Sequence, residues 1–293
     1  SFPTRRSSDL TQWRQIIMRK ETNIIKERRK LKNLSQKQLG AFIGSQAMVS
    51  RIESGQILPN AQSIYFICKE LDITIDEYFS NNFEIDFNIV NFRNKLNYKY
   101  LHDDIDGLYA MYNELKLRKI LTLNNKHDIL MLKATIYHTK FRIASTTDQN
   151  ILIDYFNKLI SWQLYNIYLL ECTVNMLPVT LVRPYISDIL GQYIYETVQY
   201  NQLDNITNLI IRFFETSLLQ NKPIIIEWII KKIEDIPLED SLTHQVWLLF
   251  LIGLYRNEQH KIDQAYTILT ILDDCHLKNI FKRIALQYAQ MRE

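Results

Sequence analysis

Apolar residues recur three and four positions apart along almost the whole chain, which is the spacing of residues on one face of an α-helix. Near the N-terminus, Ile24, Ile25 and Leu31 follow this spacing and are surrounded by lysine and arginine. No segment shows a convincing alternation of period two, which would be typical of a strand. The pattern therefore predicts an all-α protein whose first helix, over residues 22–32, has a basic face.

Two short helices joined by a tight turn are predicted next. Ser35 is followed three residues later by Gln38, and this capping-box pattern marks the start of the second helix. Gly44 and Ser45 then form the turn, because glycine tolerates a positive φ and serine can cap the helix that follows. The third helix is predicted over 46–54 and ends at a glycine.

The third helix places apolar and polar residues on opposite sides. Val49 and Ile52 face inward, and the residues that face outward are Gln46, Ala47, Ser50 and Arg51. A glutamine can pair with adenine, an arginine with guanine, and an alanine methyl can touch the thymine methyl. The pair of helices therefore predicts a reader of the DNA major groove.

Two more helices complete a predicted five-helix unit. Asn60 can cap a helix over 61–71, and Thr74 can cap one over 75–79. Cys68 lies on the apolar face of the first of these helices. We interpret it as a small buried hydrophobe, because nothing nearby in the sequence would lower the pKa of its thiol.

From residue 89 onward, helical patterns follow one another with short connections. The predicted helices span 89–101, 105–119, 126–144, 149–162, 165–177, 184–200, 203–219, 223–233, 242–256, 262–272 and 277–291. Breaks are predicted at 124–125, 146–148, 221–223 and 236–237. Many antiparallel helices of this length predict stacked pairs, an α-solenoid.

One helix pair carries a recognisable repeat signature. A tetratricopeptide repeat has a small residue in its first helix, an alanine twelve positions later and a large apolar residue four beyond that. Gly253, Ala265 and Leu269 satisfy this spacing, whereas the usual tyrosine is displaced by one position to Tyr255. The other pairs keep the length but not the signature, so the repeats are degenerate.

Charge and cysteine usage refine this division of the chain. Although the net charge is +3, residues 18–82 alone carry +3 and residues 83–293 carry −2, so the positive excess suits phosphate contact by the N-terminal unit. We predict a leader over 1–17 that is either non-native or disordered, a DNA-binding domain over 18–82, a linker over 83–88 and a repeat domain over 89–293. Three widely spaced cysteines and no membrane-length apolar segment predict a cytoplasmic protein.

The segment over 22–81 resembles the Xre or Cro/C1 type of helix-turn-helix domain, through its capped second helix, its turn and the sequence SRIESG at 50–55. The resemblance implies that Gln36 holds a phosphate, that Gln46, Ala47 and Ser50 face the bases, and that Arg51 contacts backbone or base. It also implies a structural role for Glu53. The candidate DNA-binding residues are Ser35, Gln36, Lys37, Gln46, Ala47, Ser50 and Arg51.

Nearly all of the chain after the leader resembles the Rgg/GadR/MutR regulators, within the Gram-positive peptide-pheromone receptors that act in quorum sensing. The sharpest match begins at Trp162, with Tyr165 three residues later and an apolar run after it. Asn166 stands where that family has an acidic residue. The resemblance implies a cytoplasmic homodimer, formed through the repeat domain, whose concave groove binds a short hydrophobic signalling peptide.

An extended peptide needs polar groups for its backbone and cations for its carboxylate, set among apolar pockets. The candidate peptide-binding residues are Asn175, Arg142, Arg93 and Lys95. Asn175 is the strongest of these, because a buried amide without a partner would cost roughly 1–3 kcal/mol. The reading as a surface residue stays open for each of the four.

No pattern predicts catalysis, a metal site or a cofactor. The chain lacks GxGxxG, GxxxxGK[ST], GxSxG and HExxH, and its six histidines have no metal-ligand spacing. We therefore predict a non-enzymatic transcription regulator that binds duplex DNA, and in which a peptide changes DNA affinity or contact with RNA polymerase. Two alternatives stay open: a ligand-independent repressor of phage or toxin type, and a protein-interaction module tethered to DNA.

Overall fold

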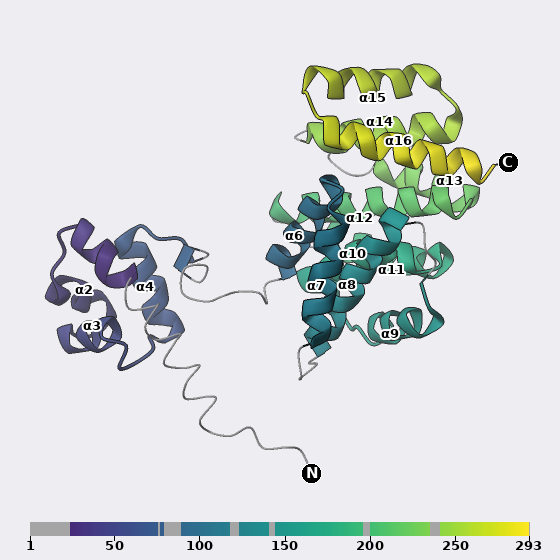
Figure 1. Cartoon of the computed structure of the whole chain (residues 1–293). Coiled ribbons are helices and arrows are strands. Elements are labelled where there is room, and N and C mark those ends of the chain that lie inside the picture. Colours follow the sequence, from purple (N-terminus) through teal and green to yellow (C-terminus); the bar gives the residue numbers. More distant parts are fainter. Residues whose placement is uncertain are drawn as a thin grey trace, which may run out of the picture. The chain divides into compact units, whose positions relative to one another are not determined.

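The computed structural model describes residues 24–75, 77–78, 89–117, 123–140, 144–195, 200–234 and 241–292. The chain divides into two compact units, residues 1–88 and 89–293 (Figure 1). All regular secondary structure in the described residues is helical, which confirms the all-α prediction. The predicted leader over 1–17 and linker over 83–88 lie outside the described residues.

The N-terminal unit surrounds one apolar core. A helical segment over 24–31 is followed by α2 (Gln36–Ile43), α3 (Gln46–Glu53) and α4 (Ala61–Leu71), and residues 75 and 77–78 are also helical. The core residues are Ile25, Leu39, Ile43, Val49, Ile52, Ile67, Cys68, Leu71, Ile73 and Tyr78. Burial raises the pKa of the Cys68 thiol, as expected for a small hydrophobe in a core.

The caps of these helices are those that the sequence predicted. The Ser35 side chain accepts from the Gln38 backbone N–H while the Gln38 side chain accepts from the Ser35 backbone N–H, which completes a capping box. Gly44 has a φ of 122°, and Ser45 caps α3 through the backbone N–H of Met48. The turn between α2 and α3 thus depends on a backbone conformation that L side chains rarely adopt.

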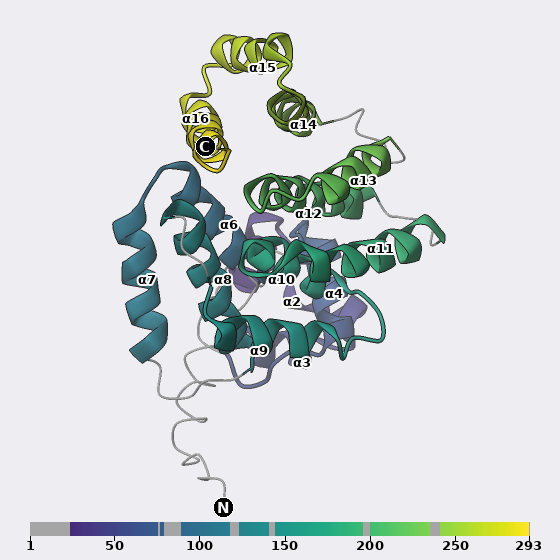
Figure 2. The ribbon, with the colours of Figure 1, turned by 90° about the vertical axis from the view of Figure 1, so that its right-hand side faces the viewer.

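The C-terminal unit is a stack of helices: α6 (Ile89–Leu101), α7 (Ile105–Leu117), α8 (Leu123–Lys140), α9 (Thr146–Phe156), α10 (Leu164–Thr173), the 3₁₀ turn η1 (Val174–Met176), α11 (Val179–Tyr195), α12 (Tyr200–Leu219), α13 (Pro223–Ile233), α14 (Leu242–Arg256), α15 (Gln259–Ile271) and α16 (Cys275–Gln290). The even-numbered helices from α6 to α14 each contact the next of the series, as a solenoid requires. The last helix, α16, returns to contact both α12 and α6 (Figure 2).

The predicted bounds of α6, α13 and α14 agree with the structure at both ends, but two predicted breaks and one predicted helix start are wrong. Asn124 and Asn125 lie inside α8, and residues 146–148 form the first turn of α9 because Ser145 caps that helix. Pro184 lies inside α11 and does not start it. Val179 and Val182 are fully buried before it, so tertiary packing extends the helix toward its N-terminus.

The predicted break at 221–223 is confirmed, since Asn221 has a φ of 50° and Pro223 begins α13. The break predicted at 236–237 lies outside the described residues. The helix predicted over 165–177 is α-helical only to Thr173 and then tightens into η1. This tightening determines where Asn175 lies.

The repeat signature corresponds to a close helix crossing between α14 and α15. A Cβ added at Gly253 would lie 2.9 Å from the Lys261 Cβ and 3.2 Å from the backbone N of Ile262. Ala265 is fully buried and Leu269 almost so. The small residue is therefore required by the distance between the helices, as the tetratricopeptide spacing predicted. No described helix is long and apolar enough to cross a membrane.

Candidate functional site

The outer face of α3 presents the side chains that the sequence assigned to DNA. Gln46, Ala47, Ser50 and Arg51 are all exposed, while the inward-facing Val49 is 1% exposed. The Arg51 Nε donates a long hydrogen bond of 3.4 Å to the Ala47 carbonyl, within the same helix. The arginine therefore lies along the exposed face of α3, within reach of a duplex placed against that helix.

A buried ion pair between Arg29 and Glu53 fixes the C-terminal end of α3 to the rest of the unit. The Arg29 guanidinium donates to both carboxylate oxygens of Glu53, with Nε–Oε1 at 2.5 Å and Nη2–Oε2 at 3.0 Å. A third donor, Gln36 Nε2, lies 2.8 Å from the same Oε2. Arg29 also donates to the Leu34 carbonyl at 2.6 Å. Glu53 thus links the first helical segment, α2 and α3, which confirms its structural role.

The pKa values of this pair follow from its contacts. Burial alone would raise the pKa of Glu53, but hydrogen bonds from Arg29 and Gln36 lower it below its ordinary value. The hydrogen bond to Glu53 raises the pKa of Arg29 in turn. Both groups are therefore charged when the domain is folded, and each charge offsets the cost of burying the other.

This cluster includes two residues to which the sequence assigned other positions or contacts. Arg29 belongs to the segment 22–32 for which the sequence predicted a basic face, but it is only 8% exposed because it pairs with Glu53. Glu53 lies 24 positions away along the chain, so no local pattern reveals the pairing. Gln36 is half-buried, and one of its amide protons is committed to Glu53. Its carbonyl and second N–H are left for another partner. Ser35 and Lys37 beside it are exposed at the start of α2.

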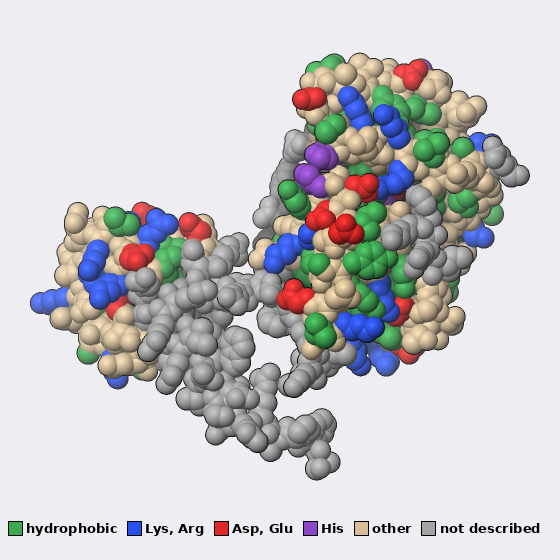
Figure 3. Space-filling view, viewed as in Figure 1, with side chains coloured by type: hydrophobic (Ala, Val, Ile, Leu, Met, Phe, Trp, Pro, Cys, Tyr) green, Lys and Arg blue, Asp and Glu red, His purple; other side chains and the backbone are tan. Residues whose placement is uncertain are grey.

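The remaining basic residues of this unit are spread over its surface (Figure 3). Lys32 forms an ion pair with Asp72 at 2.5 Å, and Arg28 lies 3.8 Å from Glu77. These pairs neutralise part of the predicted basic face. Exposed pairs of this kind contribute little to stability and can exchange for phosphate contacts.

The C-terminal unit contains three neighbouring cavities that share lining residues, and we call them together the inner groove. The wide chamber, about 540 Å³, is lined by residues of α8, α9, η1, α12 and α16. The narrow waist, about 30 Å³, shares His138, Asn175 and Thr216 with the wide chamber. The far chamber, about 210 Å³, shares Tyr100 and Arg212 with the waist and reaches α14. The groove therefore follows the inner helices of the stack.

Charged side chains form the floor of the waist. The Arg93 guanidinium faces Glu171, with Nη2–Oε1 at 3.0 Å and Nε–Oε2 at 2.9 Å, and both side chains are buried. The Arg212 guanidinium lies 3.3 Å from Glu215, whose other carboxylate oxygen is 2.7 Å from His138 Nε2. The groove floor is therefore an interconnected set of ion pairs.

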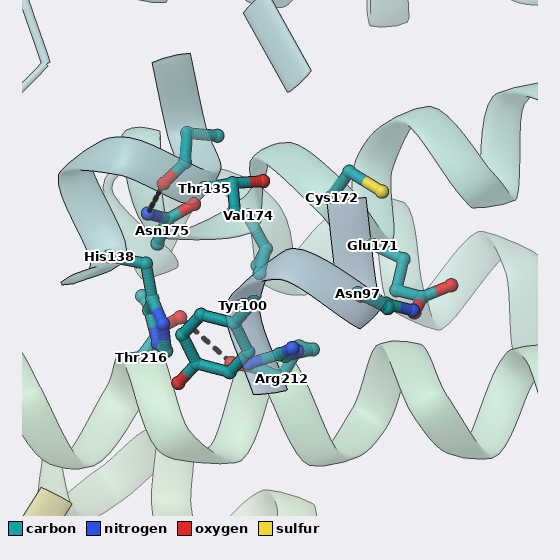
Figure 4. Close-up of a pocket in the computed structure, with 11 residues that line it drawn as sticks. Asn97, Tyr100, Thr135, His138, Glu171, Cys172, Val174, Asn175, Arg212 and Thr216 are labelled. Atoms are coloured by element: carbon teal, nitrogen blue, oxygen red, sulfur yellow. Dashed lines mark hydrogen bonds between the residues drawn. The ribbon is translucent and has the colours of Figure 1, made fainter. Parts of the chain in front are cut away.

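Tyr100 lies between His138 and Arg212 (Figure 4). Its ring is 4.9 Å from the His138 ring, and the Arg212 guanidinium lies 4.9 Å from the ring centre. The Tyr100 hydroxyl is buried and has no hydrogen-bond partner in the described residues. A buried hydroxyl of this kind is a polar group that a ligand could satisfy.

The pKa values of the two carboxylates of the floor shift in opposite directions. Burial raises the pKa of Glu171, and Arg93 offsets this only in part. Burial would also raise the pKa of Glu215, but His138 and Arg212 lower it below its ordinary value. The charge of Glu171 is thus compensated less completely than that of Glu215, chiefly by Arg93 and to a smaller extent by Arg212.

The four candidate peptide-binding residues are placed differently. Asn175 lines both the waist and the wide chamber, where its Nδ2 donates to the Ala134 carbonyl at 2.8 Å. Arg93 is buried against Glu171, and Lys95 is exposed on α6. Arg142 lies outside the described residues. Asn175 is the only described candidate that reaches the groove surface.

Sequence reasoning missed the groove residues that come from distant helices. Glu171, Arg212 and Glu215 stand in predicted helices, but nothing in their spacing reveals that α10 and α12 bring them together. Their one local signal is that charged residues interrupt largely apolar helix faces. A charge at such a position is rarely buried without a partner.

The motif at Trp162 is a structural corner. The Trp162 backbone N–H donates to Gln192 Oε1 at 2.9 Å, and Gln192 Nε2 donates back to the Trp162 carbonyl at 3.0 Å. Asn166 caps α10 by accepting from the Gln163 N–H, and its Nδ2 donates to the Tyr155 hydroxyl. The amide in place of the family's acidic residue therefore serves as a cap in this chain.

The N-terminal unit and its exposed α3 define the class of protein. Two short helices with a glycine turn, the second carrying outward amide, hydroxyl and guanidinium groups, form a helix-turn-helix. Residues 25–78 match the helix-turn-helix family, which is therefore the DNA-binding class to which this unit belongs.

Residues 106–284 match the family described as "HTH-type transcriptional regulator Rgg, C-terminal domain". Because this match covers more than half of the chain, the chain belongs to the Rgg family of helix-turn-helix transcriptional regulators. The resemblance seen in the sequence is confirmed.

Solved structures share the fold at low sequence identity. The SHP pheromone receptor Rgg2 of Streptococcus dysgalactiae is 18% identical, with a TM-score of 0.66 over 92% of this chain and 99% of that one. PlcR of Bacillus thuringiensis, solved with the peptide PapR7 and DNA, is 20% identical, with a TM-score of 0.61 over 90% and 99%. The PrgX/cCF10 complex is 12% identical, with a TM-score of 0.65 over 93% and 92%.

Proposed function

We propose that this Rgg-family chain is a transcription regulator whose DNA affinity is controlled by a short peptide bound in the inner groove. The observation that carries the proposal is the groove itself, which joins an amide-rich apolar chamber to a floor of ion pairs. Extended peptides are bound by such combinations of backbone-directed polar groups and apolar pockets. The peptide complexes of PlcR and PrgX, which share the fold, support it.

For the DNA-binding half, we propose that α3 enters the major groove. Gln46, Ala47 and Ser50 would face the bases, and Arg51 would contact base or backbone. Ser35, Gln36 and Lys37, at the start of α2, would hold a phosphate of the adjacent strand. The exposed N-terminus of α2 favours an anion at that position.

For the whole protein, we propose a cytoplasmic, non-enzymatic homodimer that dimerises through the repeat unit. A peptide can change DNA affinity only if it binds one arrangement of the dimer more tightly than another. Altered contact with RNA polymerase is the other output that such a change could have.

Calorimetry of the full chain tests the proposal, with synthetic peptides translated from the short reading frames beside its gene. We expect one peptide to bind and to shift the affinity for a duplex selected from a random-sequence pool. Duplex binding without any peptide effect would indicate the ligand-independent repressor. Absence of duplex binding would contradict the DNA-binding half, which a steep salt dependence would support.

A further inference from the structure

The wide chamber of the inner groove has an unusual lining. Apart from His138, which is paired with Glu215, none of its described lining residues is charged. Five carboxamides line it instead, from α9, η1, the turn after α12, and α16: Gln149, Asn175, Gln220, Gln287 and Gln290. Apolar groups, including Met176 and Met291, occupy the spaces between them. A chamber of this kind offers hydrogen bonds without offering a counter-charge.

Two of these carboxamides are already committed to the protein backbone. Asn175 Nδ2 donates to the Ala134 carbonyl at 2.8 Å. Gln220 accepts from the Val179 N–H at 3.0 Å and donates to the Leu177 carbonyl at 2.9 Å. These side chains shape the wall of the chamber, and Gln220 has little capacity left for a ligand.

Two others are buried or half-buried without such a commitment. Gln287, on α16, is only 9% exposed, and Gln149, on α9, is half-buried. Neither side chain has a hydrogen-bond partner among the described residues. Neither residue is among those with a fully buried, unpartnered polar atom, so the two amides are accessible and remain free to bind a ligand in the chamber.

We propose that Gln149 and Gln287 are specificity-determining residues, which bind the backbone of an uncharged stretch of peptide in the wide chamber and exclude charged side chains from it. This inference rests on the proposed function, namely that the groove binds a peptide. A carboxamide can donate to a peptide carbonyl and accept from a peptide N–H, which suits an extended backbone. α16, the last helix of the fold, thereby supplies one wall of the specificity site.

The exclusion follows from desolvation. A lysine or aspartate side chain that entered the chamber would lose part of its hydration. The described lining offers a lysine no carboxylate, and it offers an aspartate no cation apart from His138, which is paired with Glu215. A glutamate in place of Gln149 would supply that counter-ion for a lysine. The selectivity of the chamber should therefore be reversible by a single change from amide to carboxylate.

The test uses the full chain and a defined mixture of synthetic octapeptides. One half of the mixture is uncharged between its termini, and the other half carries a single lysine or aspartate at each position in turn. Bound peptides are separated by gel filtration and quantified by mass spectrometry. We expect the wild type to retain the uncharged peptides at least about tenfold better than those charged at the chamber position.

The variants Gln149→Glu and Gln287→Glu should each shift retention toward lysine-containing peptides. The matched control is Asn150→Asp, the same chemical change at the next position of α9, where the side chain is exposed. It should select peptides as the wild type does. Because Gln149 and Gln287 lie on different helices, one variant still tests the inference if the other fails to fold.

Equal retention of charged and uncharged peptides by the wild type would overturn the inference. Retention by both glutamate variants that matched the wild type would overturn it as well, while leaving peptide binding intact. A wild-type protein that retained no peptide of either kind would overturn the proposed function and this inference together.

Discussion

At the scale of single residues, the Arg29–Glu53 pair positions α3, the proposed DNA-reading helix. Glu53 is the last residue of α3, and its carboxylate accepts three hydrogen bonds from two other elements. A buried ion pair of this type is weak evidence for net stability, but the loss of one partner is expensive because the other charge is left uncompensated.

We therefore predict that Glu53→Gln destabilises the N-terminal unit by about 3 kcal/mol, since Arg29 would remain buried without a counter-charge. Hydrogen–deuterium exchange of the α3 amides in the full chain measures this directly. Glu27→Gln, at an exposed position of the first helical segment, is the control and should leave protection unchanged. Wild-type protection in Glu53→Gln would show that the pair does not hold α3.

His127 makes stability depend on pH. Its ring is 1% exposed, Nδ1 lies 2.9 Å from the Tyr165 hydroxyl, and Nε2 is buried without a partner. Burial lowers the pKa of His127 from 6.5 to about 4. The unfolded chain therefore binds this proton more tightly than the folded chain. The contribution of neutral His127 to the free energy of unfolding is fully present above about pH 6.5 and is lost as the pH falls toward 4.

The expected loss between those pH values is on the order of 3 kcal/mol. Urea unfolding followed by tryptophan fluorescence measures it, because the three described tryptophans all lie in the C-terminal unit. His127→Phe should remove most of this pH dependence, and His260→Gln, at an exposed position, should not. An unaltered pH dependence in His127→Phe would assign the effect to other groups.

At the scale of elements, α3 combines a buried face and a reading face within eight residues. We predict that Arg51→Ala lowers affinity for the selected duplex by roughly tenfold and leaves dimerisation unchanged, because the side chain is exposed and lies outside the core. Gel shift and analytical ultracentrifugation measure the two properties.

If Arg51 contacts a phosphate, the salt-dependence slope should also fall by about one. Lys69→Ala, at an exposed position of α4 outside the proposed reading face, is the matched loss of a positive charge and should have a smaller effect. A gel shift identical to that of the wild type would remove Arg51 from the contact surface.

The α14–α15 crossing leads to a prediction at the same scale. Gly253→Ala should destabilise the C-terminal unit by about 1–3 kcal/mol, because the new methyl group would meet Lys261 and the backbone of Ile262. Gly191→Ala, in α11, introduces a methyl group with no atom within 4 Å, and should stabilise by about 1 kcal/mol through helix propensity. Thermal denaturation compares the two, and equal effects would contradict the packing argument.

At the scale of the whole molecule, peptide binding to one unit must be energetically coupled to DNA binding by the other if a peptide controls DNA binding. Linkage requires that the factor by which peptide changes duplex affinity equals the factor by which duplex changes peptide affinity. We predict a reciprocal change of roughly 5–150-fold, the usual range for allosteric coupling. Calorimetric titration of peptide into the full chain, with and without saturating duplex, measures it. Identical peptide affinities would show that the units act independently.

The sequence by itself determined the local structure of this protein. The Ser35 capping box, the positive φ at Gly44 and the small residue at Gly253 are requirements of a few neighbouring residues, so they could be read directly and they predicted the elements correctly. The helix periodicity predicted the stacked pairs for the same reason. The family resemblance then extended this reading to DNA binding and to peptide control.

Only the tertiary structure decided which distant residues meet. Arg29 is turned inward by Glu53, Arg93 is paired with Glu171, and Gln149 and Gln287 face one chamber although 138 positions separate them. Pro184 lies inside a helix because buried valines outweigh its preference for a helix start. Pairing and burial depend on contacts between residues far apart in the chain, so the local periodicity of the sequence does not predict them.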